Sequence, residues 1–91
     1  MNVQKSHRPA MRAVTRGGTV LLPDLTDAEA TLVARHDNAV RKYLYTGDHT
    51  DLEEFDGMTV AGHQLETDLD ELDRYALRGE IRFEDIYDQE I

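Results

Sequence analysis

The chain has 91 residues and a formal net charge of −9, because 19 Asp and Glu outnumber 10 Lys and Arg. A chain of this length forms one small domain. It contains no Cys, which excludes disulfides, thiol catalysis and cysteine-bound zinc. No stretch approaches the roughly 20 apolar residues that cross a bilayer, and no secretory signal is recognisable. We therefore expect a cytoplasmic protein with no membrane partner.

The charge is divided unevenly along the chain. Residues 1–16 carry +4 and no acid, whereas residues 17–91 carry 19 acidic and 6 basic residues, a charge of −13. We predict a flexible basic arm over 1–18 and a single acidic domain over 19–91. The arm is an ordinary disordered terminus, a segment that contacts phosphates, or a strap that folds back onto the acidic domain. Its candidate phosphate-contacting residues are Lys5, Arg8, Arg12 and Arg16.

Two elements are predicted at the start of the acidic domain. Residues 19–22 form a short apolar run closed by Pro23, which is typical of an extended segment or an edge strand. A long helix is predicted over 26–46, because Thr26 and Glu29 have the spacing of a capping box. The apolar residues that follow recur at intervals of three and four and share one helix face.

The pattern of a threonine followed by acidic residues occurs twice more. The box that begins at Thr50 predicts a helix of about two turns, with Leu52 and Phe55 facing inward. Such a short helix is marginal alone, so packing must stabilise it. The box that begins at Thr67 predicts a third helix over 67–78.

Short β elements are predicted around the third helix. Residues 58–66 are compatible with a small hairpin that turns at Ala61-Gly62. Ile81 and Phe83 alternate with charged residues, which suggests another short strand followed by a helical turn. The predicted fold is therefore mainly α, with three helices, a long first helix and a minor β-hairpin or short strands. An α+β fold is the alternative.

The histidines are the only candidate nitrogen ligands for a metal. We interpret His36 as a boundary histidine bonded to a carboxylate or a carbonyl, because it lies beside the apolar stripe of the long helix. His49, Asp51 and His63 would bind a divalent ion only if their loops met. A metal-dependent enzyme that uses His36, His49 or His63 is the least favoured hypothesis. We predict no catalytic residue, no metal and no cofactor, since no nucleophile, glycine loop or distinctive carboxylate pair is present.

The acidic C-terminal end offers a candidate partner-binding site. A short helix there would place apolar side chains in a partner's groove, while its acids steer toward a basic rim. The alternative is that the same side chains cover the domain's own core. The candidate residues are Phe83, Asp85, Ile86 and Tyr87.

The leading functional hypothesis is a small non-enzymatic interaction or regulatory protein that binds a basic protein surface. It depends on the charge contrast between the arm and the rest of the chain. A helix-turn-helix is disfavoured, because the second and third helices present acids that repel phosphates. The alternative is a small nucleic-acid-binding regulator that contacts phosphates through the basic arm. The protein is expected to be a monomer or a homodimer.

Overall fold

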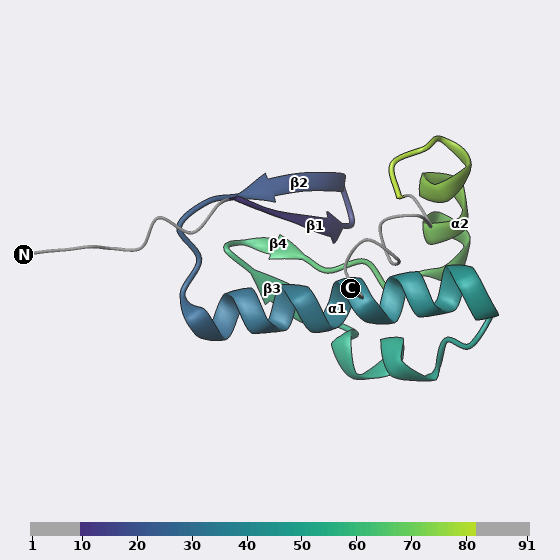
Figure 1. Ribbon diagram of the computed structural model, residues 1–91, viewed down its shortest axis with the longest axis horizontal. Coiled ribbons are helices and arrows are strands. Elements are labelled where there is room, and N and C mark those ends of the chain that lie inside the picture. Colours follow the sequence, from purple (N-terminus) through teal and green to yellow (C-terminus); the bar gives the residue numbers. More distant parts are fainter. Residues whose placement is uncertain (1–9, 82–91) are drawn as a thin grey trace, which may run out of the picture.

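A computed structural model describes residues 10–81 of the chain (Figure 1). Helices and two antiparallel hairpins are combined in it, so the fold is α+β and the prediction of a mainly α domain is wrong. The β structure that the sequence did not predict lies in Met11–Thr15, where the few apolar residues show no clear periodicity. The elements in chain order are β1 (Met11–Thr15), β2 (Gly18–Leu22), α1 (Asp27–Thr46), η1 (Thr50–Phe55), β3 (Thr59–Val60), β4 (His63–Gln64) and α2 (Leu69–Leu77).

The first hairpin includes residues that the sequence assigned to the basic arm. β1 pairs with β2 in an antiparallel register that places Thr15 opposite Gly18. Ala13, Val14 and Thr15 are buried, so this part of the chain belongs to the folded unit. Residues 10–18 therefore do not form the flexible arm that the sequence predicts. Burial of the apolar side chains of this strand is favourable enough to offset the conformational entropy that the segment loses. Residues 1–9 lie outside the described residues.

The long helix α1 has the capping box that the sequence predicts. The Thr26 hydroxyl accepts a hydrogen bond from the Glu29 N–H at 3.1 Å, and the Thr26 N–H donates to the Glu29 carboxylate at 2.9 Å. The helix ends at Gly47, whose φ of 85° is favourable only for glycine. The predicted bounds 26–46 are confirmed to within one residue.

The second helix forms, but as a 3-10 helix and without its predicted cap. Its N-cap is His49, which makes no side-chain cap bond. The Thr50 N–H instead donates to the Asp48 carboxylate at 3.0 Å, and this bond lowers the pKa of Asp48. Leu52 and Phe55 are buried, as predicted. Packing beneath α1 therefore stabilises η1, rather than a capping box.

The third helix starts later than its sequence box predicts. The N-cap of α2 is Asp68, whose carboxylate accepts from the N–H groups of Asp70 and Glu71. The Thr67 hydroxyl bonds elsewhere, to Asp56. An Asp side chain is as good an N-cap as Thr, so a sequence with both in succession has two possible starts.

The predicted hairpin is confirmed as β3 and β4, with Ala61 and Gly62 at the turn in left-handed backbone conformations. Just beyond β4, Leu65 bridges to Thr15, and backbone hydrogen bonds join Arg16 to Gln64 and Glu66 to Val14. β1 is therefore flanked by β2 on one side and by this segment on the other. Ile81 is buried, and the strand predicted to continue through Phe83 lies outside the described residues.

The helix α1 is the centre of the packing. It contacts β1, η1, β3 and α2, and Figure 1 shows the first hairpin on one side of α1 and η1 on the other. No helix within residues 10–81 is long and apolar enough to cross a membrane. The buried hydrophobic core consists of Ala13, Val14, Leu22, Leu25, Val33, Ala39, Val40, Leu52, Phe55, Val60, Leu65, Leu72, Tyr75 and Ile81.

Candidate functional site: an acidic groove between η1 and α2

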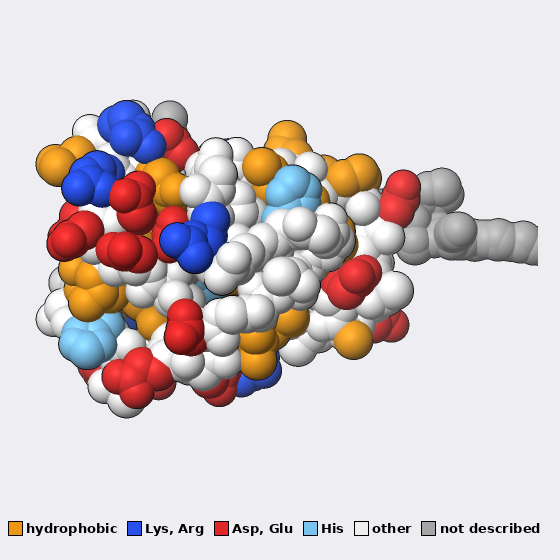
Figure 2. Space-filling model, turned by 180° about the vertical axis from the view of Figure 1, so that it is seen from behind, with side chains coloured by type: hydrophobic (Ala, Val, Ile, Leu, Met, Phe, Trp, Pro, Cys, Tyr) orange, Lys and Arg blue, Asp and Glu red, His pale blue; other side chains and the backbone are white. Residues whose placement is uncertain are grey.

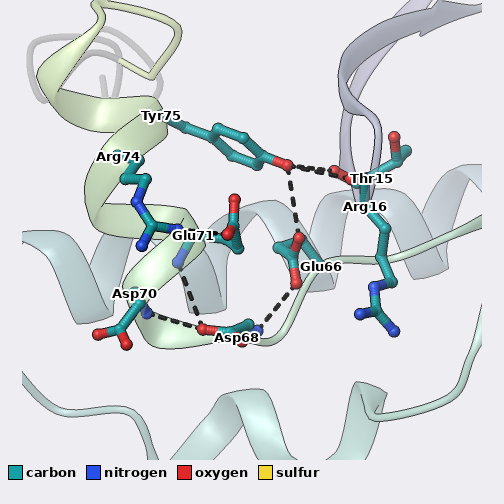
Figure 3. Close-up of polar contacts among 8 residues, drawn as sticks. All are labelled: Thr15, Arg16, Glu66, Asp68, Asp70, Glu71, Arg74 and Tyr75. Atoms are coloured by element: carbon teal, nitrogen blue, oxygen red, sulfur yellow. Dashed lines mark hydrogen bonds and ion pairs between the residues drawn. The ribbon is translucent and has the colours of Figure 1, made fainter.

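A buried carboxylate holds the segment that leads into α2 (Figure 3). Glu66 is only 2% exposed. One of its carboxylate oxygens accepts from the Asp68 N–H at 3.0 Å, and the other faces the Tyr75 hydroxyl at 3.4 Å. A buried carboxylate needs such donors, because leaving it unsatisfied is costly. Glu66 thereby ties the start of α2 to its middle.

The same cluster joins α2 to the first hairpin and to α1. The Tyr75 hydroxyl lies 3.2 Å from the Thr15 carbonyl and 3.3 Å from the Arg16 carbonyl. Burial, followed by the negative charge of Glu66, raises the pKa of Tyr75. The Nε2 of His36 lies 2.8 Å from the Glu66 carbonyl, and burial lowers the pKa of His36. The cluster is a structural junction that sets the position of α2.

A groove of about 340 Å³ lies between η1 and the start of α2. Its accessible apolar surface comes mainly from Leu69, which is partly buried, and Leu52 lies buried beneath it. The Thr67 hydroxyl donates to the Asp56 carboxylate at 3.2 Å, which links the two sides. The lining residues are His49, Leu52, Glu53, Asp56, Thr67 and Leu69.

The two acids of this groove have no cationic partner from Lys or Arg. Within residues 10–81, no Lys or Arg forms an ion pair with Glu53 or Asp56. The nearest basic group to Glu53 is the His49 ring, whose Nδ1 lies 4.0 Å from the carboxylate. Figure 2 shows acidic side chains beside hydrophobic and basic ones at the left end of the molecule, where α2 and η1 lie. The groove is therefore negative at its rim and apolar at its base.

Every Lys and Arg between residues 24 and 80 is already ion-paired with an acid of this chain. Lys42 illustrates the effect: its ammonium lies 3.2 Å from Asp51 and 3.5 Å from Asp48, and the hydrogen bond to Asp51 raises its pKa. These basic residues cannot neutralise the groove without giving up a partner. The pairs are Arg35–Glu54, Arg41–Asp37, Lys42–Asp48, Lys42–Asp51, Arg74–Glu71 and Arg78–Glu80.

A second hollow, of about 380 Å³, lies between the first hairpin and α1. Its base holds a buried ion pair, in which the Arg41 Nε donates to Asp37 at 2.8 Å. The other Asp37 oxygen is buried and has no hydrogen-bond partner. Arg41 already neutralises Asp37 within the fold. This hollow should therefore attract a cationic ligand less strongly than the groove does.

The structure places few of the predicted site residues. Arg12 and Arg16 are exposed on the first hairpin, Arg12 within β1 and Arg16 at the turn. Arg12 pairs with Leu21 in the hairpin, and the Arg16 N–H donates to the Gln64 carbonyl, so the fold holds the backbone of both. The remaining candidates lie outside the described residues, namely Lys5 and Arg8 of the arm and Phe83, Asp85, Ile86 and Tyr87 of the C-terminal end.

The histidines occupy three different environments. His36 bonds to a carbonyl, which confirms one of the two partners predicted for it. Its predicted place at the boundary of the core is wrong, because the side chain is 1% exposed and lies within the core. His49 lies exposed at the start of η1, and His63 lies exposed in β4. Among residues 10–81, no three His, Cys, Asp or Glu side chains are arranged to hold a metal ion.

Reasoning from the sequence missed the groove. Glu53 and Asp56 were considered only as reasons against DNA binding, and Thr67 only as a helix cap. The usable signal was the pair of neighbouring helix starts, each with an apolar residue among acids, at Leu52 and Leu69. Which sides of these helices meet depends on the tertiary fold.

Comparison with known proteins does not extend these observations. No family model, no curated protein and no solved structure matches the chain.

Proposed function

We propose that this protein is a small, non-enzymatic interaction protein whose acidic end binds a basic protein surface. The supporting observation is that Glu53 and Asp56 have no Lys or Arg partner within residues 10–81. Among residues 24–80, the Lys and Arg side chains are already paired with other acids. A basic partner would supply the missing countercharge.

The electrostatics of the whole chain support the same class of partner. The charge of −13 over residues 17–91 repels phosphate backbones and attracts cationic surfaces. Long-range attraction of this kind increases the rate of association and weakens as salt is added. As part of this proposal we place the protein in the cytoplasm, which fractionation of cells that express it would check.

Affinity capture with the immobilised full chain tests the proposal. Bound proteins are identified by mass spectrometry after washes at low and high ionic strength. We then measure the affinity of each purified candidate by calorimetry. The proposal requires a basic partner whose binding weakens with salt. Finding no such partner, or only partners that are acidic or nucleic acids, would refute it.

A matched pair of variants localises the binding surface. Glu53→Gln with Asp56→Asn removes two charges from the groove and retains the Asp56 oxygen that accepts from Thr67. Asp24→Asn with Glu29→Gln removes two charges near the start of α1, where Gln can still form the capping box. The first variant should weaken partner binding more than the second, although both make the net charge less negative by the same two units.

A further inference from the structure

The groove has the chemistry of a receptor for one long cationic side chain. It combines the partly buried Leu69, above the buried Leu52, with two carboxylates, Glu53 and Asp56, in a volume of about 340 Å³. Lys and Arg carry an apolar stem that ends in a cationic head, and they place the stem on apolar surface while the head stays near water or an anion. We propose that the groove binds a single Lys or Arg side chain of the basic partner. This inference rests on the proposed function.

Other ligand classes fit the groove less well. An anion would be repelled by both carboxylates. A purely apolar side chain would remove water from Glu53 and Asp56 without giving either a partner, which is unfavourable. A cationic side chain satisfies both parts of the groove, because its stem covers Leu69 and its head pairs with the acids.

Contacts around the groove keep its two sides in place. Leu52 is 2% exposed and anchors η1 in the core. The Thr67 hydroxyl bonds to Asp56 across the groove, and Glu66 holds the Asp68 N–H at the start of α2. A preformed site loses less conformational freedom when it binds a ligand. The backbone of both sides and the Asp56 carboxylate are thus positioned before the partner arrives.

Short peptides separate this inference from general charge attraction. The probes are acetylated, amidated peptides of sequence Gly-X-Gly-X-Gly, in which X is Arg, Lys, citrulline or norleucine. Each is titrated into the uniformly ¹⁵N-labelled full chain at low ionic strength, and amide chemical shifts are followed. Citrulline retains the shape of Arg without its charge, and norleucine retains the Lys stem.

We expect the Arg and Lys peptides to produce saturable shifts at Leu52, Glu53, Asp56, Thr67 and Leu69. The citrulline and norleucine peptides should produce shifts that are much smaller at the same concentrations. The Glu53→Gln/Asp56→Asn variant should bind the Arg peptide about tenfold more weakly, as expected for the loss of two partly exposed ion pairs. The Asp24→Asn/Glu29→Gln control should bind within about twofold of the wild type, because it removes only distant charge.

The apolar part of the groove is tested separately with Leu69→Ser, which leaves all the charges in place. Unchanged helical circular dichroism shows that the variant is folded, and its affinity for the Arg peptide should still fall. If Leu69→Ser does not fold, a peptide in which X is 2,4-diaminobutyric acid provides the test, because it retains the charge of Lys on a shorter apolar stem and should bind more weakly than the Lys peptide. Equal affinities for these two peptides would refute the apolar contact.

The outcomes distinguish the two proposals. Shifts spread over the acidic surface, or equal affinities for the two charge variants, would refute the groove. The proposed function would survive that result if the captured basic protein still bound with salt-sensitive affinity. Shifts in the groove with citrulline as strong as with Arg would also refute the inference, since the carboxylates would then have no role.

Discussion

Substitution of Tyr75 by Phe tests whether the buried polar cluster stabilises the fold. The Tyr75 hydroxyl lies within 3.2–3.4 Å of three oxygens, on Thr15, Arg16 and Glu66. It has one hydrogen to donate, so its removal eliminates about one hydrogen bond and not three. It also leaves the buried Glu66 carboxylate with one donor fewer.

The expected loss follows from these two contributions. A hydrogen bond to a charged group contributes about 1.5–3 kcal/mol, and a buried acceptor left unsatisfied adds a penalty of similar size. Because the contacts are long, we expect Tyr75→Phe to lower the free energy of unfolding by about 1.5–3 kcal/mol. A chain of this length has roughly 5–14 kcal/mol in total, so the variant remains folded.

Urea denaturation followed by circular dichroism measures this loss, and Tyr43→Phe is the control. The Tyr43 hydroxyl donates to Asp73 at 3.0 Å, a shorter bond than any made by Tyr75, but an exposed one. Water replaces that bond, so Tyr43→Phe should cost about 0.5 kcal/mol or less. If the two substitutions lower the free energy of unfolding equally, or Tyr43→Phe lowers it more, burial does not strengthen the contribution of the Tyr75 hydrogen bonds to stability.

Three further predictions concern stability. Thr26→Ala should lower the free energy of unfolding by about 1 kcal/mol, because it removes a formed cap. Thr50→Ala should change it by no more than about 0.5 kcal/mol, because Thr50 caps no helix. Equal losses in urea denaturation would contradict this difference between the two helix starts. Leu72→Ala creates a core cavity and should lower the free energy of unfolding by about 2–5 kcal/mol. Leu77→Ala is the control, because Leu77 is 87% exposed and should tolerate the change. Comparable shifts of the two thermal midpoints would count against the described packing. Because burial lowers the pKa of His36 in the folded state, protons bind preferentially to the unfolded state, and stability should fall as the pH drops below about 6.5. His36→Gln keeps a donor for the Glu66 carbonyl and lacks this titration, so parallel stability–pH curves for the two proteins would refute the assignment.

Sequence patterns succeeded where a structure depends on neighbouring residues. The start of α1 requires only Thr26 and Glu29, three positions apart, and its end requires only Gly47. The β3–β4 turn similarly needs only Ala61 and Gly62. Each of these signals has few competing solutions, because the groups that satisfy the backbone lie within one turn.

The pattern was less reliable where two local solutions were similar in energy. Thr67 and Asp68 can both cap α2, and Asp68 does so because Thr67 is used by Asp56, eleven residues earlier. The box at Thr50 is a good local match, yet the segment forms a 3-10 helix. Packing of Leu52 and Phe55 under α1 outweighs the preference of a six-residue segment.

The pairing of β1 and the existence of the groove depended on contacts between residues distant in the chain. β1 is buried because β2 covers one edge, the segment at Leu65 covers the other and α1 covers a face, and none of these is visible in residues 11–15. Within residues 10–81, the acids of the groove have no Lys or Arg partner, because the fold places most of these cations beside other carboxylates. Helix caps are satisfied within a few residues, whereas burial and ion pairing are decided by which distant surfaces meet.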